Sequence, residues 1–308
     1  MLNTLTNVSF RNEYATICGL TKDEIQFYFS EQLSELADNY AITKSALMDT
    51  MSSIYDGYHF SRSLVGVYNP FSVCNALANL RLNSYWIASG SNEMLLKVLR
   101  KFINEIPELD NCLSDVNMND PKLFLYQSGY LTIKKVVGSS YMLGYPNREV
   151  RNAMFGMILP IMLHKESSQV SNAIQELKIS MLAANIDRSI LCLKQLVAGT
   201  PYSTQKKENF VFEEHFRFIL KNIFYLCGFK VSEEQQMSAG RIDLVVETSE
   251  NIYILELKMS DNGGVVSASH QISSRHYADA YAASSKPVIS LALEFDRQSR
   301  GLMDWKML

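Results

Sequence analysis

Hydrophobic residues recur at helical spacing over much of the first 200 residues of this 308-residue chain. Residues three and four apart share one face of a helix, so the pattern predicts amphipathic helices. Thr21 and Glu24 have the spacing of a capping box, and Asn69 followed by Pro70 is typical of a helix start. We expect helices at 25–36, about 43–54, 70–82, 91–106 and 148–163, with further helices to about residue 198.

Two short runs with strand character interrupt the helical pattern. They cover residues 124–136 and 139–147 and meet at Gly138, which predicts a small β-hairpin. Helices on both sides of a hairpin favour a winged-helix-like or lid subdomain, which we place at residues 107–200. The region before it, residues 1–106, is expected to be mostly helical.

A different pattern begins after 199–209, a polar segment with Gly and Pro that is the best candidate for a linker. Beyond it, apolar runs of strand length lie between helical segments, so we expect a separate α+β domain at residues 205–308. Its predicted order is a helix at 211–228, strands at 229–236, 241–247 and 251–258, a helix at 268–284 and a strand at 287–295. The chain is thus predicted to belong to the mixed α/β (α+β) class.

Three charged residues stand inside two of these apolar strands, in the stretch RIDLVVETSENIYILELK (241–258). Side chains alternate between the two faces of a strand, so Glu256 and Lys258 share one face. If a two-residue turn at Ser249–Glu250 joins the strands, residues whose numbers sum to 499 pair, and Asp243 lies opposite Glu256. A slip of two residues would still keep the three groups on one face.

Two carboxylates this close repel each other unless a cation lies between them. Mg²⁺ favours sites with few protein carboxylates, completed by water and phosphate oxygens. A lysine beside them can position or deprotonate a water, or stabilise negative charge on a phosphodiester. Asp243, Glu256 and Lys258 therefore fit metal-assisted phosphodiester hydrolysis. The alternative is a solvated face of a half-exposed strand, which also alternates apolar and polar positions.

Composition and charge limit the other classes of function. The net charge of −3 gives no overall attraction to nucleic acid or to anionic membranes. Residues from Lys206 onward carry twelve Lys and Arg against fourteen Asp and Glu, so this domain alone should bind DNA weakly. No stretch approaches the roughly 18 apolar residues of a membrane span, and the start lacks the pattern of a secretory signal. Five scattered cysteines form no C-x-x-C pair, which favours reduced thiols and a cytoplasmic protein.

The motifs of residues 205–308 resemble those of the PD-(D/E)XK nuclease superfamily. GRIDLVVET and YILELK are similar to two strand motifs of the nuclease-like domain that follows an AAA-ATPase-like region in a family of bacterial proteins. The resemblance implies a mixed four-stranded sheet between helices, with Asp243 and Glu256 as metal ligands and Lys258 as the catalytic lysine. It further assigns an E-x-H motif and a Q-I-x-x-(K/R)-x-Y-A-x-x-Y helix to Glu213, His215, Gln271, Arg275, Tyr277 and Tyr281.

Several of these residues have two interpretations. Glu213 can orient a metal-bound water, or it can simply favour the positive end of a helix dipole. Gln271 can contact the site from the helix after it, or be a partly exposed polar residue. His215 is expected to pack or to form a hydrogen bond. Tyr277 and Tyr281, four residues apart on one helix face, are expected to pack in the core.

The first two thirds of the chain also resemble that AAA-ATPase-like family, through segments such as YDGYHFS, VYNPFSV and GYPNREVR. The phosphate-binding loop G-x-x-x-x-G-K-[ST] does not occur in the sequence, so we expect no ATP site and no ATP hydrolysis in this chain. Residues 1–106 are interpreted as the C-terminal remnant of the ATPase region. A truncated gene, a misassigned start or a trimmed protein would each produce such a chain.

The predicted activity is that of a nuclease that depends on Mg²⁺ or Mn²⁺ and cleaves DNA or RNA, with DNA favoured. Asp243, Glu256 and Lys258 would carry it, supported by Glu213 and Gln271. Nucleic acid is the expected partner, and no membrane is involved. The alternative is a non-catalytic interaction or regulatory module, or a decayed fragment of an AAA-ATPase-like protein.

Overall fold

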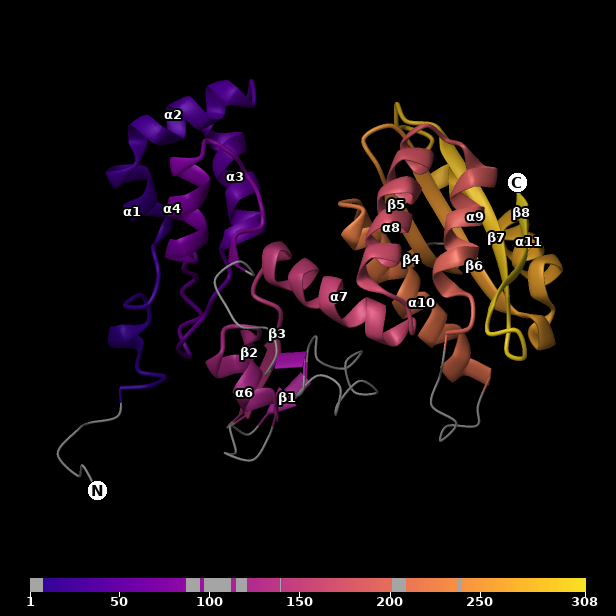
Figure 1. The fold of residues 1–308 in the computed structure, drawn as a ribbon, viewed down its shortest axis with the longest axis horizontal. Coiled ribbons are helices and arrows are strands. Elements are labelled where there is room, and N and C mark those ends of the chain that lie inside the picture. Colours follow the sequence, from indigo (N-terminus) through magenta and orange to yellow (C-terminus); the bar gives the residue numbers. More distant parts are fainter. Residues whose placement is uncertain are drawn as a thin grey trace. The chain divides into compact units, whose positions relative to one another are not determined.

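A computed structural model describes residues 8–86, 95–96, 112–114, 121–138, 140–200, 209–237 and 240–308 (Figure 1). The chain divides into two compact units, Met1–Met154 and Phe155–Leu308, and the boundary falls inside helix α7 (Arg148–Met162). Most of the expected helix at 91–106 and of the expected linker at 199–209 lies outside the described residues.

Helices with well-formed N-terminal caps build the start of the first unit. The predicted capping box is confirmed: the Thr21 amide donates to Glu24 Oε2 at 2.8 Å, and the Glu24 amide donates to Thr21 Oγ1 at 3.3 Å. Asn69 caps the helix predicted to begin at Pro70, which occupies the first turn. The elements are a 3₁₀ helix (Asn12–Tyr14), α1 (Lys22–Tyr28), α2 (Ser30–Asn39), α3 (Lys44–Tyr55) and α4 (Pro70–Ala78).

The helix expected at 25–36 is in fact two helices. Phe29, with φ −120° and ψ 29°, separates α1 from α2. The break lets both short helices bury apolar residues in the same core, among them Ile25 and Leu33. The helix that begins at Pro70 ends at Ala78, earlier than the predicted residue 82.

The predicted hairpin is present and belongs to a small three-stranded sheet. Strands β2 (Thr132–Val137) and β3 (Ser140–Gly144) pair antiparallel, and β1 (Cys112–Ser114) pairs with the other edge of β3. Gly138 has φ +61°, a left-handed conformation that suits glycine in the tight turn. The start of the predicted strand run at 124 is wrong, because those residues belong to helix α6 (Pro121–Gln127).

The second unit contains a five-stranded mixed sheet with helices, which confirms the mixed α/β class. Its elements are α8 (Ser167–Leu182), α9 (Ile186–Val197), α10 (Asn209–Leu226), β4 (Lys230–Met237), β5 (Gly240–Glu247), β6 (Ile252–Met259), a 3₁₀ helix (Ser260–Asn262), α11 (Gly264–Arg275), a 3₁₀ helix (Tyr277–Tyr281), β7 (Val288–Asp296) and β8 (Gly301–Met307). The expected sheet had four strands. The fifth, β8, pairs antiparallel with β7.

Strand order β4-β5-β6-β7-β8 places one parallel pair, β6 and β7, inside an otherwise antiparallel sheet. Parallel neighbours need a crossover connection, and α11 provides it. This helix packs on the sheet face that carries Val245, Ile254 and Ala292. Phe216 of α10 stacks on Phe295 of β7, with ring centroids 4.4 Å apart. Phe295 is an odd number of residues from Ala292 on β7, so α10 covers the opposite face.

The helix expected at 268–284 begins earlier and is interrupted. It starts at Gly264, whose left-handed φ of +50° favours glycine and where an added Cβ would displace the Glu294 carboxylate. It ends at Arg275, because His276 adopts a left-handed conformation with φ +47°. Tyr277 therefore begins a 3₁₀ helix, and its ring is buried in the core beneath α11. The predicted core packing is confirmed for Tyr277 and, in part, for Tyr281, which packs against the same core. The prediction that the two residues lie on one face of a continuous helix is wrong.

None of the helices in the part of the chain that the structure describes combines the length and apolar character needed to cross a membrane.

Candidate active site

The hairpin of β5 and β6 has the register that the sequence predicted. Leu244 pairs with Leu255 and Glu247 with Ile252, so the numbers of paired residues sum to 499. A two-residue turn joins the strands, closed by the Thr248 amide donating to the Asn251 carbonyl at 2.9 Å. This register brings residue 243 to the position across from residue 256.

Asp243 lies where the two strands part. The paired positions end at Leu244 and Leu255, and the next amide of β6 that points toward β5, that of Leu257, donates to Asp243 Oδ2 at 2.9 Å. The other oxygen, Oδ1, faces Arg217 of α10, with Nη1 at 3.4 Å. Both side chains are largely buried. Asp243 is therefore held by a backbone amide on one side and a guanidinium on the other.

Glu256 is fully buried, and its two carboxylate oxygens have different surroundings. Oε1 accepts from Lys258 Nζ at 3.3 Å, whereas the buried Oε2 has no hydrogen-bond partner. Burial, followed by repulsion from Asp243, raises the pKa of Glu256 to about 8. The carboxyl group therefore holds its proton near neutral pH as long as no further cation is present.

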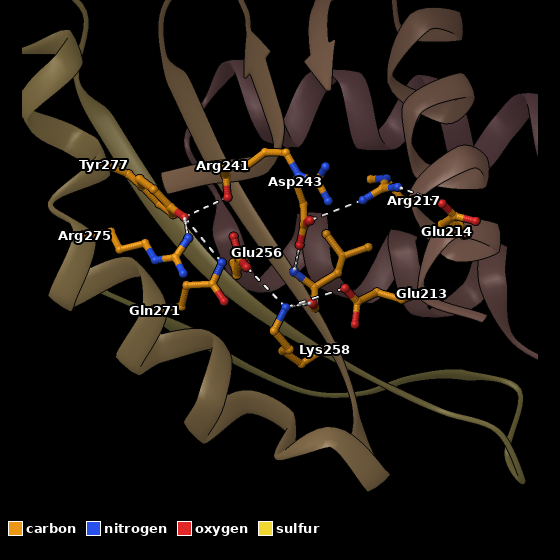
Figure 2. Close-up of polar contacts among 11 residues, drawn as sticks. Glu213, Glu214, Arg217, Arg241, Asp243, Glu256, Lys258, Gln271, Arg275 and Tyr277 are labelled. Carbon is orange, nitrogen blue, oxygen red and sulfur yellow. Dashed lines mark hydrogen bonds and ion pairs between the residues drawn. The ribbon is translucent and has the colours of Figure 1, made fainter. Parts of the chain in front are cut away.

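Lys258 joins two acidic residues from different elements (Figure 2). Its Nζ lies 3.3 Å from Glu256 Oε1 and 3.5 Å from Glu213 Oε1 of α10, and donates to the Leu257 carbonyl at 3.1 Å. Burial alone would lower the pKa of Lys258, but the carboxylates of Glu256, Glu213 and Asp243 outweigh it and raise that pKa. The side chain is thus an ammonium ion and a donor, not a free amine.

The structure brings together four of the five predicted site residues, namely Asp243, Glu256, Lys258 and Glu213. Burial raises the pKa of Glu213, and the nearby Asp243 adds to the rise, while Lys258 partly offsets it. Gln271 of α11 lies at the other side of the site, where its Nε2 donates to the Tyr277 hydroxyl at 3.3 Å. That hydroxyl in turn donates to the Arg241 carbonyl at 2.7 Å. Gln271 is therefore tied to the backbone of β5 two residues before Asp243.

Arg217 lies at this site but was not among the residues predicted from the sequence. Its guanidinium lies between Asp243 and Glu214, with Nη2 3.7 Å from Glu214 Oε1. A signal was available, because Arg217 is four residues after Glu213 and so lies on the same face of the helix. Figure 2 shows Arg217 directed toward Asp243 of β5 and Glu213 directed toward Lys258 of β6.

His215 lies outside this cluster, and its ring meets Phe216 edge to face with centroids 5.8 Å apart. Its Nε2 is buried and has no hydrogen-bond partner, so His215 packs, which is one of the two roles that the sequence predicts for it. Burial lowers the pKa of His215 to about 4.

We expect the His215→Phe variant to resist mild acid better than the wild type. The unfolded histidine takes up a proton below about pH 6.5, while the folded one does so only near pH 4. Wild-type stability is therefore intact above pH 6.5 and falls as the pH drops through this window, by about 1–3 kcal/mol. Urea unfolding at pH 7 and pH 4.5 measures the difference. The exposed His270→Phe serves as control, and equal acid sensitivity of wild type and His215→Phe would contradict the prediction.

Asp243 and Glu256 provide carboxylate oxygens that suit a divalent cation. The buried Oε2 of Glu256 has no hydrogen-bond partner, and the second acid, Asp243, lies nearby. A divalent ion would supply the positive charge that compensates these two acids. Among the described residues, no group of three or more His, Cys, Asp and Glu side chains is arranged to hold a metal ion. Since Mg²⁺ takes only one or two protein carboxylates and keeps several waters, these two acids fit it.

The chain is similar to a known protein over most of its length and to a known family over part of it. The chain is 26% identical over 315 residues to a protein of Azotobacter chroococcum mcd 1 named "Uncharacterized protein in vnfD 5'region". The match covers 98% of this chain and 58% of that protein, so the chain spans little more than half the length of this relative. No solved structure gives a significant match. Residues 211–305 match the family model of the PD-(D/E)XK nuclease superfamily.

Proposed function

We propose that residues 211–305 hydrolyse phosphodiester bonds of a nucleic acid with the help of Mg²⁺ or Mn²⁺. The observation that carries this proposal is the arrangement of Asp243, Glu256 and Lys258 at the parting of β5 and β6. Two buried acids face one another there, one with an unpartnered oxygen, and an ammonium group lies beside them. A solvated strand face would not bury these groups.

Asp243 and Glu256 would hold the ion, which supplies Lewis-acid stabilisation of the phosphodiester and lowers the pKa of a bound water. Lys258 has a raised pKa and so remains charged, which suits it to donate to a phosphate oxygen as negative charge develops. Glu213, whose pKa is raised by burial, lies 3.5 Å from Lys258 and can accept the proton of the attacking water. Gln271 and Tyr277 support the strand that carries Asp243.

DNA is the preferred substrate class in this proposal, with RNA as the second arm of the test. Earlier in the chain, residues 1–106 would be the C-terminal part of an AAA-ATPase-like region and residues 107–200 a lid or winged-helix-like subdomain. ATP hydrolysis is not assigned to this chain, because its sequence contains no phosphate-binding loop.

The decisive experiment is a cleavage assay of the purified chain on single-stranded DNA, duplex DNA and RNA of one sequence, with Mg²⁺, Mn²⁺ or EDTA. Asp243→Asn keeps an oxygen for the Leu257 amide but removes the negative charge, so we expect cleavage to fall by about 10³-fold. The exposed Asp279→Asn is the matched control and should cleave like the wild type.

Two results would count against the proposal. Equal cleavage by wild type and Asp243→Asn would identify a contaminating nuclease. A wild-type protein that is folded, binds nucleic acid or protein, and cleaves none of the three substrates with either metal would favour the alternative of a non-catalytic interaction module.

A further inference from the structure

Arg217 occupies a position that a cation-binding site would be expected to leave open. Of the two oxygens of Asp243, Oδ2 is taken by the Leu257 amide. Oδ1 faces the Arg217 guanidinium at 3.4 Å. A divalent ion bound by Asp243 would lie close to this guanidinium, and the two positive charges would compete for one carboxylate.

The guanidinium also has a second partner on its own helix. Nη2 lies 3.7 Å from Glu214 Oε1, and the Glu214 side chain is 45% exposed whereas that of Arg217 is 9% exposed. Charge left without a partner in a buried position is costly, so an arginine that loses Asp243 needs another acid close by. Glu214 is placed to be that acid, without movement of the helix backbone.

We infer that Arg217 is a built-in counter-ion that neutralises Asp243 when no metal is bound and moves toward Glu214 when a divalent ion takes its place. This inference rests on the proposed metal site and goes beyond it, because it assigns the chain a competitor for its own cation. It predicts that Arg217 weakens metal binding and stabilises the site when no metal is bound.

Two substitutions should shift metal affinity in opposite directions. Arg217→Met removes the competing charge and keeps much of the apolar side chain, so the Kd for Mn²⁺ should fall at least about ten-fold, equivalent to about 1.4 kcal/mol. Glu214→Gln removes the second partner and leaves the guanidinium on Asp243, so the Kd should rise several-fold. The matched control is Lys221→Met. It removes a positive charge from the same helix, but Lys221 pairs with Glu233 and not with Asp243.

Isothermal titration with Mn²⁺ at pH 8, together with unfolding temperatures in EDTA and in Mn²⁺, measures these effects without any substrate. Arg217→Met should unfold at a lower temperature than the wild type in EDTA and gain more from Mn²⁺. An unchanged or raised Kd for a folded Arg217→Met would overturn the inference, as would a lowered Kd for Glu214→Gln. Should Arg217→Met fail to fold, Glu214→Gln alone decides.

The two levels of the proposal fail in different ways. A wild type that binds no Mn²⁺ would remove the metal site and with it both conclusions. The other case is a wild type that binds Mn²⁺, an Asp243→Asn variant that does not, and an Arg217→Met variant with the wild-type Kd. These results would leave the proposed nuclease site intact and refute only the role of Arg217.

Discussion

Lys258→Met should reduce metal-dependent cleavage by about 10³-fold and leave the protein folded. The substitution keeps a side chain of similar length but removes the ammonium group that lies between Glu256 and Glu213. Strand β6 then offers no positive charge to the phosphate at this site. Single-turnover cleavage at saturating Mg²⁺ separates this loss of rate from a change in substrate binding.

Metal binding distinguishes this prediction from simple collapse of the site. Lys258 is itself a cation beside the two proposed ligands, so Lys258→Met should bind Mn²⁺ at least as tightly as the wild type. Lys258→Arg keeps the charge but places a larger planar group there, and should also lose most of the activity. Lys230→Met, on an exposed side chain of β4, is the control. Cleavage by Lys258→Met at the wild-type rate would remove the lysine from the mechanism.

Glu256→Gln should stabilise the metal-free protein at alkaline pH, although it destroys the proposed metal site. The amide replaces a buried carboxylate that is repelled by Asp243 and whose second oxygen has no partner. We expect the variant to be more stable than the wild type by several kcal/mol at pH 9 in EDTA, at about 1.4 kcal/mol for each pKa unit.

The pH window of this effect follows from the two pKa values of the carboxyl group. Below about pH 4.5 it is protonated in both the folded and the unfolded chain, and its contribution to stability is complete. Between pH 4.5 and about 8 the folded protein holds a proton that the unfolded chain has released, so stability falls as the pH rises. The advantage of Glu256→Gln should therefore be small at pH 5 and largest above pH 8.

Chemical unfolding in EDTA at pH 5, 7 and 9 measures this window, with Glu250→Gln on the turn of the same hairpin as the exposed control. Addition of Mg²⁺ at pH 8 should stabilise the wild type and leave Glu256→Gln unchanged, because the ion compensates the same charge. Parallel pH dependences for wild type and Glu256→Gln would show that the carboxyl group is not protonated in the folded chain.

Much of this site could be predicted because a hairpin with a two-residue turn leaves few choices. Once Ser249–Glu250 is taken as the turn, the pairing of Leu244 with Leu255 follows, and so does the approach of Asp243 to Glu256. A slip of two residues would also have kept the three charged groups on one face. The assignment of Glu213 came from the family resemblance and not from spacing.

The remaining features depend on contacts that no local pattern records. The four-residue spacing from Glu213 places Arg217 on the helix face of the site, but its partner Asp243 is 26 positions away and does not follow from the helix pattern. Strand β8 lacks regular alternation, because it lies at the sheet edge and only its first residues are buried. The end of α11 at His276 depends on a left-handed residue that is not glycine, and helix propensity favours continuation there.

The hairpin turn has a consequence for how this domain can change in evolution. Asn251 is fastened to the end of α8 by hydrogen bonds to the Met181 and Leu182 carbonyls, so β6 cannot slide to absorb an altered turn. A residue inserted between Thr248 and Asn251 must therefore be taken up as a longer loop, because a one-residue slip of β6 would send Glu256 to the opposite side of the sheet. Lineages that keep the activity should therefore tolerate a longer turn here, but not a shift in the pairing of β5 with β6.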